Sequence, residues 1–329
     1  MPNIIVMGGG IGGITMAYEL RHHLGRDAQI LLISDRDTFQ FTPSNPWVAV
    51  GWRRRARVEV PLAPHLARHG IRFDATGVAA VHPERSRLTL ADGRTLDYDY
   101  LVVATGPELA FDAIPGCGPD DGHTQSVCTT PHAAGAHTAL EALVADPGPV
   151  VVGSLPGASC FGPAYEYAFV LDRELRRRKI RHKVPMTFVT AEPYIGHLGL
   201  DGVGDTKSML ESELRDRHIP WITNARTTRV DAAAMTVEEL DDLGQVRREH
   251  RIDKRMAMML PPFRGVAALA QTGALVNDKR FVLVDDYQRN PAYPNVYAVG
   301  VCVAIPPIAQ TPVPCGVPKT GFMIETMAN

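Results

Sequence analysis

The chain has 329 residues and a formal net charge of −2, with 45% hydrophobic and 21% charged residues. Because single hydrophobic cores stop growing at about 250–300 residues, the length predicts two domains. The composition excludes a disordered, collagen-like or coiled-coil chain, and the near-neutral charge gives no reason to expect a nucleic-acid partner. No run approaches the roughly 18 apolar residues of a spanning helix. We expect neither a transmembrane helix nor a signal peptide, because the chain opens directly on a strand-like segment.

The N-terminal residues follow the pattern of a dinucleotide-binding βαβ unit. A strand-like run over residues 3–7 leads into the glycines Gly8, Gly10 and Gly13, and a helix-like apolar spacing and a second apolar strand over residues 30–33 come next. In this pattern the first glycine allows a tight turn, the second lets the backbone approach a pyrophosphate, and the third lets helix and strand pack closely. The phosphates would lie at the helix N-terminus, where free N–H groups favour anions.

In dinucleotide-binding folds the residue that ends the second strand is usually acidic and forms hydrogen bonds with a ribose. Here that position is Ser34, and Asp35 follows it. A hydroxyl can also form a hydrogen bond with a ribose hydroxyl, so the sequence leaves either residue as the ribose contact.

Two later segments resemble the signatures of flavin oxidoreductases that contain two dinucleotide folds. The first ends in Thr105 and Gly106, and the second ends in Gly300. Together with the N-terminal glycines they favour FAD as the bound dinucleotide. The Asp that usually follows the last glycine is replaced by Val301.

A second βαβ pattern begins in the middle of the chain, with a strand over residues 149–153 and a helix over residues 159–175. We therefore predict an α/β protein with two Rossmann-like dinucleotide-binding domains. The FAD-binding domain is expected to be discontinuous, formed by residues 1–112 and 264–329, with residues 113–263 as the second domain.

The glycine loop of the second unit departs from the dinucleotide pattern. Leu155 stands where the middle glycine should be, and its branched side chain is expected to obstruct NAD(P)H. Cys160 follows near the predicted start of the helix, where the helix dipole is expected to lower the pKa of the thiol. The alternative is a buried, inert cysteine.

Four longer segments carry a more specific resemblance, which extends over residues 1–329. Residues 39–47, 156–167, 192–199 and 311–321 are similar to those of bacterial sulfide:quinone oxidoreductases. The resemblance implies FAD as cofactor, sulfide and quinone as substrates, and polysulfide or sulfur as product. It also implies peripheral, monotopic attachment to a membrane surface through a C-terminal region, which we expect this chain to lack.

The resemblance also implies site residues. Cys128 and Cys160 match redox cysteines, and the third family cysteine is expected in the C-terminal region. Glu166, His132 and His197 match residues on the sulfide and flavin side, where they would move protons or form structural hydrogen bonds. Lys319 and Pro43 are assigned to the flavin. Cys302 and Cys315 are additional cysteines, for which packing or a small turn residue is the simple account.

The implied reaction begins with attack of hydrosulfide on an oxidised cysteine–sulfur bridge, which leaves a persulfide. Two electrons then pass to FAD and on to a quinone. A type II NADH:quinone dehydrogenase is the main alternative, but it needs an open second glycine loop, which Leu155 argues against. The second alternative is a protein without enzymatic activity, either a flavin-bound sulfur sensor or a truncated remnant.

Overall fold

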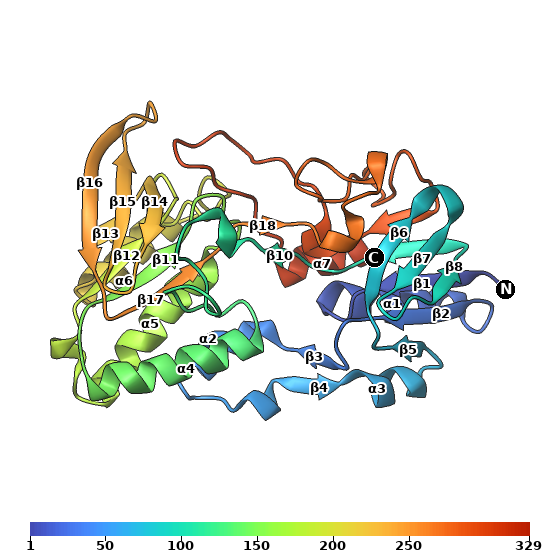
Figure 1. The fold of residues 1–329 in the computed structure, drawn as a ribbon, viewed down its shortest axis with the longest axis horizontal. Helices are drawn as coiled ribbons and strands as arrows, with labels where there is room; N and C mark the ends of the chain where they lie inside the picture. Colours follow the sequence, from blue (N-terminus) through green and yellow to red (C-terminus); the bar gives the residue numbers. More distant parts are fainter.

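Five parallel strands form the sheet of the first unit, in the order β19-β9-β1-β2-β5. The computed structural model describes residues 1–329. The last strand in the chain lies beside strands from its first third, so both ends of the sequence build one unit (Figure 1). The strands are β1 (Asn3–Met7), β2 (Gln29–Ile33), β5 (Arg72–Asp74), β9 (Tyr100–Val103) and β19 (Val296–Ala298).

Alternate residues of these strands face two different layers. Ile5 packs in a cluster with Leu88 of an antiparallel ribbon, whereas Val6 packs in a cluster with Ala17 and Leu66 of two helices. This alternation follows from the pleat of a strand, and here both faces are apolar because both are covered. The ribbon consists of β6 (Val78–His82), β7 (Arg87–Leu90) and β8 (Thr95–Asp97); the helices are α1 (Ile11–Leu24) and α3 (Leu62–Arg68), and α7 (Gly321–Ala328) packs on α1.

The second unit repeats this three-layer arrangement around a four-stranded parallel sheet in the order β13-β12-β11-β17. Helices α4 (Thr130–Ala145) and α5 (Gly162–Arg177) cover one face, and an antiparallel ribbon covers the other. The sheet strands are β11 (Val150–Ser154), β12 (Met186–Val189), β13 (Trp221–Ile222) and β17 (Met256–Leu260). The ribbon strands are β14 (Ala225–Val230), β15 (Ala234–Leu240) and β16 (Val246–Asp253), and α6 (Thr206–Asp216) completes the unit.

The two connections between the units pair with each other. Strand β10 (Glu108–Leu109) runs antiparallel to β18 (Phe263–Arg264), and Arg264 also forms ion pairs with Glu108 (2.6 Å) and Asp112 (2.9 Å). The predicted α/β class with a discontinuous first unit is confirmed. We place the domain boundaries in this two-stranded crossing, and the division at 112/113 and 263/264 stays a proposal.

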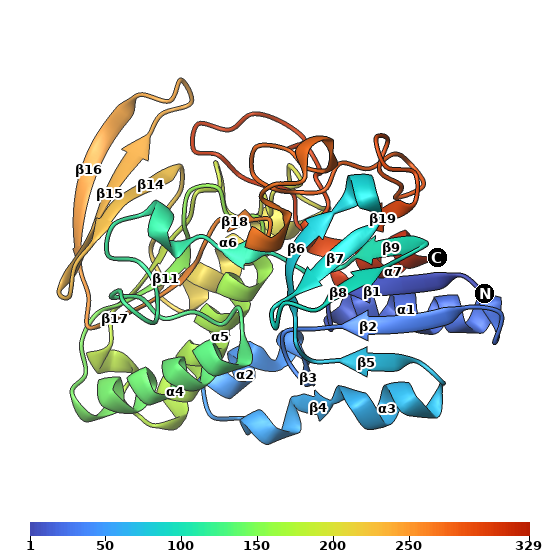
Figure 2. The same ribbon diagram turned by 45° about the vertical axis from the view of Figure 1, so that its right-hand side comes forward.

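One segment of the first unit, residues 38–61, extends into the second unit, and we call it the arm. After β3 (Thr38–Gln40) the chain forms α2 (Asn45–Ala49), which packs against α4 and α5, and it returns through β4 (Glu59–Pro61) (Figure 2). Val48, Ala49 and Val50 belong to the same apolar cluster as the two helices. The sequence did not predict this insertion.

Short 3-10 helices complete the chain. They span Thr42–Ser44, Arg55–Arg57, Pro83–Arg85, Phe111–Ala113, Arg181–Lys183, Ala267–Leu269, Gly273–Leu275 and Gly300–Cys302. None of the helices combines the length and the apolar character that crossing a membrane requires.

Candidate functional site

The glycine loop between β1 and α1 is closed where the fold requires it and open where a ligand would approach. Gly8 has a φ of +127°, and a Cβ atom there would lie 2.2 Å from the carbonyl oxygen of Ala104. A Cβ atom on Gly13 would lie 1.9 Å from the carbonyl oxygen of Gly8, whereas a Cβ atom on Gly10 would meet no atom within 4 Å. The first turn of α1 also leaves N–H groups without partners in the helix. This cradle fits a dinucleotide pyrophosphate.

Ser34 and Asp35 point in different directions. Ser34 is buried, and a Cβ atom built on Gly9 would lie 2.8 Å from its Oγ atom, so the hydroxyl borders the glycine loop. The carboxylate of Asp35 is largely exposed and pairs with Arg36 at 3.4 Å. This geometry favours Ser34 as the ribose contact, which stays a prediction.

The other predicted flavin residues follow the carboxyl ends of β9 and β19, which are neighbours in the sheet. Gly106 has a φ of +68°, and no atom lies within 4 Å of the position of a Cβ atom there. The hydroxyl of Thr105 donates to the carbonyl oxygen of Gly106 at 3.1 Å, and Gly300 is buried against Ile324. Ligands of open α/β sheets bind at this edge.

Lys319 provides a partly buried cation beside these loops. Its ammonium group lies 4.8 Å from the ring centre of Phe281. Burial lowers the pKa of Lys319, and the nearby thiol of Cys302 opposes this shift. Cys302 is fully buried, donates to the carbonyl oxygen of Val103 at 3.2 Å, and has a pKa raised to about 11 by burial. The packing role expected for Cys302 fits these contacts.

Pro43 lies on the arm that leads to α2, within the 3-10 helix Thr42–Ser44. A cavity of about 450 Å³ adjoins this segment. Its lining combines apolar side chains with two arginines and one hydroxyl: Phe39, Phe41, Ser44, Arg53, Arg57, Val58 and Val60.

Cys128 and Cys160 lie in the segments that precede two helices on the same face of the second sheet. Cys128 lies two residues before α4, and Cys160 lies two residues before α5. Burial, with a smaller contribution from charge on Cys160, raises the pKa of the Cys128 thiol to about 12. All five cysteines are free thiols.

The expected lowering of the Cys160 pKa is wrong for this structure. Helix α5 begins at Gly162, later than predicted, and burial raises the pKa of the Cys160 thiol to about 11. The loss of hydration that a thiolate would suffer outweighs the favourable field of the helix N-terminus.

The three predicted proton carriers lie on separate elements, and no hydrogen bond joins them. Glu166 of α5 accepts from the indole nitrogen of Trp47 at 3.0 Å, and burial raises its pKa. His132 of α4 lies 3.8 Å from Asp120, and His197 accepts from the backbone N–H of Gly199 at 3.1 Å. Burial lowers the pKa of both histidines.

A buried carboxyl group that the sequence analysis missed holds the loop of His197. Glu192 is fully buried and accepts hydrogen bonds from the Tyr165 hydroxyl and the Leu198 N–H, both at 2.7 Å. Burial raises its pKa. Glu192 lies in a segment that carried the family resemblance, but no charge pattern marked it.

The glycine loop of the second unit is covered by the chain itself. The N–H of Gly157 donates to the carbonyl oxygen of Pro314 at 2.7 Å, and the N–H of Gly316 donates to Ala158 at 2.8 Å. Leu155 is fully buried in the core on the ribbon side of the sheet. The expected obstruction by the Leu155 side chain therefore needs correction, because the backbone of residues 313–316 covers the loop.

Comparison with known proteins decides the family. A family model described as pyridine nucleotide-disulphide oxidoreductase matches residues 2–316. The sulfide-quinone reductase of Aquifex aeolicus is 43% identical over 328 residues, which cover 99% of this chain and 74% of that protein. The chain belongs to the sulfide:quinone reductase family. Proteins of this family are FAD-binding flavoproteins, and the protein is an FAD-dependent oxidoreductase. The assignment of the glycine cradle to this FAD stays a prediction.

Solved structures agree with this assignment. The crystal structure of the Aquifex aeolicus sulfide:quinone oxidoreductase superposes with a TM-score of 0.94 and covers 100% of this chain and 75% of that chain. An NDH2 structure from Plasmodium falciparum gives a TM-score of 0.73 over 92% of this chain and 64% of that chain, at 17% identity, which shows a shared fold alone.

Proposed function

We propose that the protein oxidises sulfide at Cys128 and Cys160 and passes the electrons through FAD to a quinone. The observation that carries this proposal is the placement of the two cysteines, each two residues before one of the two helices that cover the same face of the second sheet. Membership of the sulfide:quinone reductase family supports the same substrates.

The cysteine pair performs sulfur exchange. When a sulfur bridge joins the two cysteines, hydrosulfide attacks one sulfur of the bridge. One sulfur–sulfur bond forms and one breaks, which leaves a persulfide on one cysteine and a thiolate on the other. Each sulfide that becomes zero-valent sulfur, released as sulfur or polysulfide, loses two electrons. FAD, when bound, would supply the acceptor for these two electrons and their route to a quinone, which also takes up two protons.

The chain's own acids and bases supply the proton transfers. Burial raises the pKa of both thiols, so each thiol holds its proton near neutral pH unless a base removes it. Burial also raises the pKa of Glu166 and lowers those of His132 and His197. The raised pKa favours the protonated, acid form of Glu166, and the lowered pKa favours the neutral, base form of the two histidines, so we assign these three residues to proton transfer.

Lys319 is assigned to the flavin. Its partial burial beside Cys302 and the loop of Thr105 places a fixed positive charge in a medium of low dielectric constant. A cation there would stabilise negative charge on the reduced cofactor.

We further propose that the protein meets its quinone at a membrane surface as a peripheral, monotopic protein. Quinones with long tails reside in the bilayer, and none of the helices is suited to span it. Exposed Phe41 and Val60 lie beside Arg53 and Arg57 at one cavity, a combination that suits an interface between lipid and water.

The flavin spectrum tests the proposed function. Sulfide added to the FAD-loaded protein without oxygen is expected to bleach the flavin absorbance, and decylubiquinone is expected to restore it. The Cys160→Ser variant should retain the spectrum and lose the bleaching. A flavin that sulfide leaves oxidised in the wild type would contradict the proposal, and bleaching by NADH instead would favour an NADH:quinone dehydrogenase.

A further inference from the structure

Asn45 of α2 forms hydrogen bonds with residues on both sides of Cys128 in the sequence. Its amide Nδ2 donates to the carbonyl oxygen of Val127 at 3.0 Å, and its Oδ1 accepts from the hydroxyl of Thr130 at 3.3 Å. Asn45 and Thr130 are each 0% exposed. Because buried polar groups that lose a partner cost free energy, these two bonds define where the loop can lie.

The loop that carries Cys128 is irregular, and Val127 is buried in the apolar cluster that also contains Val48, Ala49 and Val50 of the arm. Residues 126–129 belong to no helix or strand, and the N–H of Cys128 donates to the hydroxyl of Ser126 at 3.1 Å. A further hydrogen bond from the arm comes from the side chain of Gln40, which accepts from the N–H of Thr130 at 3.2 Å. Side chains of the arm therefore supply the polar contacts that hold both sides of Cys128.

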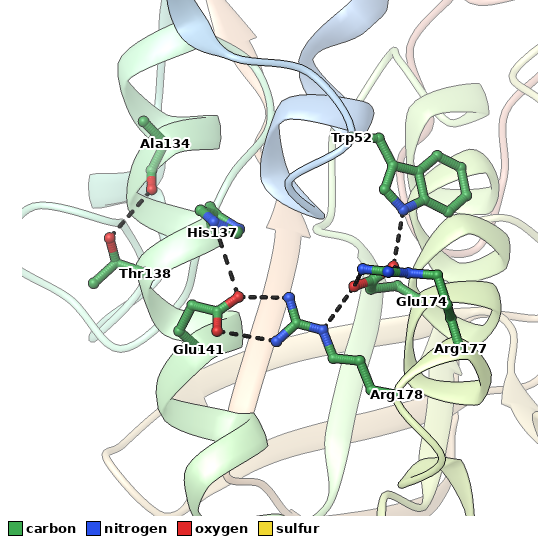
Figure 3. Close-up of polar contacts among 8 residues, drawn as sticks. All are labelled: Trp52, Ala134, His137, Thr138, Glu141, Glu174, Arg177 and Arg178. Carbon is green, nitrogen blue, oxygen red and sulfur yellow. Dashed lines mark hydrogen bonds and ion pairs between the residues drawn. The ribbon is translucent and has the colours of Figure 1, made fainter.

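The same arm is fixed to α5, the helix that follows Cys160. The indole nitrogen of Trp47 donates to Glu166 at 3.0 Å, and that of Trp52 donates to Glu174 at 2.9 Å. Glu174 is fully buried and is also held by Arg177 and Arg178 at 2.6–2.7 Å (Figure 3). The arm thus connects the helix beside one cysteine with the loop that carries the other.

We propose that Asn45 is a positioning residue that sets the separation of the Cys128 and Cys160 sulfur atoms. This inference rests on the proposed pairing of the two cysteines. The bonds of Asn45 to Val127 and Thr130 relate the Cys128 loop to α5, and without them the loop drifts from the position in which a sulfur bridge can close.

Thiol cross-linking tests this inference without any need for turnover. Dibromobimane becomes fluorescent when both of its bromomethyl groups have reacted with thiols, and peptide mass spectrometry identifies the joined cysteines. The reduced, FAD-loaded wild type is expected to give a Cys128–Cys160 cross-link. Asn45→Ala should slow its formation by about tenfold, the equivalent of roughly one buried hydrogen bond. Thr130→Val, which removes the hydroxyl and keeps the shape, should also slow it, whereas Thr130→Ser should restore the wild-type rate.

A matched variant separates positioning from general destabilisation. Asn290 is also 0% exposed, and its amide donates to the carbonyl oxygen of Leu283 at 2.7 Å in the first unit. Asn290→Ala should leave the cross-linking rate unchanged. A wild type that forms no cross-link would overturn the cysteine pairing itself. A wild type that cross-links at the same rate as Asn45→Ala would overturn the role of Asn45 alone, and if Asn45→Ala does not fold, the contrast between Thr130→Val and Thr130→Ser decides.

Discussion

Gly157 donates its backbone N–H to the carbonyl oxygen of Pro314 across a distance of 2.7 Å. In a nucleotide-binding domain the N–H groups of this loop would face a pyrophosphate. Here Pro314 accepts the hydrogen bond from the loop instead, and the N–H of Gly316 donates a second hydrogen bond to the carbonyl oxygen of Ala158. The second Rossmann-like unit has therefore kept its sheet and helices while its nucleotide loop has become a contact within the chain.

We predict that NADH does not reduce the flavin, and that Leu155→Gly does not change this. The substitution restores the glycine pattern of the loop but leaves Pro314 on the N–H of Gly157, so the pyrophosphate still lacks a donor. Stopped-flow absorbance after addition of NADH provides the measurement. Removing a buried leucine is expected to lower the free energy of unfolding by about 2–5 kcal/mol, so a thermal melt must first show that the variant is folded. Rapid bleaching of the Leu155→Gly flavin would show that the side chain was the obstacle.

Two substitutions in the first glycine loop are expected to have different effects, one on FAD binding and the other on folding. Gly10→Ala places its methyl group in open space, so the protein should fold normally but bind FAD more weakly, because the methyl group blocks the approach of the pyrophosphate. Gly13→Ala places a carbon 1.9 Å from the carbonyl oxygen of Gly8, so it should disrupt the packing of α1 on β1. The ratio of flavin to protein absorbance and a thermal melt together distinguish these results. Equal melting temperatures for the two variants would contradict this account of the loop.

Glu174 should contribute a stability that depends on pH. Burial raises the pKa of this carboxyl group, but hydrogen bonds from Arg177, Trp52 and Arg178 outweigh burial and lower the pKa from 4.5 to about 2. A carboxyl group with a lowered pKa in the folded state stabilises that state above its unfolded pKa, and the contribution disappears as the pH falls from about 4.5 towards 2. Glu174→Gln should therefore be less stable than the wild type at pH 6, and the difference should shrink in acid. Denaturant unfolding between pH 6 and pH 3 measures this; a difference that stays constant would contradict it.

The features that the sequence predicted are those that depend on neighbouring residues. Gly8, Gly10 and Gly13 lie close together in the sequence, so the steric requirements of the loop can be recognised from their spacing alone. The contact of Asn45 with Val127 spans 82 positions, and that of Gly157 with Pro314 spans 157 positions (314 − 157). Nothing local in either segment marks its partner. The prediction of a lowered Cys160 pKa failed for the same reason. The hydration of the thiol depends on packing by residues distant in the sequence, whereas the helix dipole can be inferred from neighbouring residues.

The raised pKa of Cys160 can be measured through its reactivity. Because the thiolate is the nucleophile, alkylation by iodoacetamide should rise about tenfold for each pH unit and level off only near pH 11. Peptide mass spectrometry separates Cys160 from the other four cysteines. A rate that levels off below pH 8 would show that the helix N-terminus dominates over burial after all.

The last prediction concerns the separate contributions of the cysteines. Cys160→Ser should keep the fold and FAD yet lose reduction of the flavin by sulfide by several orders of magnitude, because a hydroxyl cannot exchange sulfur and no other nucleophile replaces it. Cys128→Ser should retain part of the activity, since it removes the partner that closes the bridge and assists the release of sulfur. Cys117→Ser is the control: its thiol lies beside Lys254 in the segment after the domain crossing, burial raises its pKa to about 12, and its loss should be nearly silent. Anaerobic stopped-flow absorbance with sulfide ranks the three variants. Reduction of the Cys160→Ser flavin at close to the wild-type rate would show that sulfide reaches the flavin without passing through this cysteine.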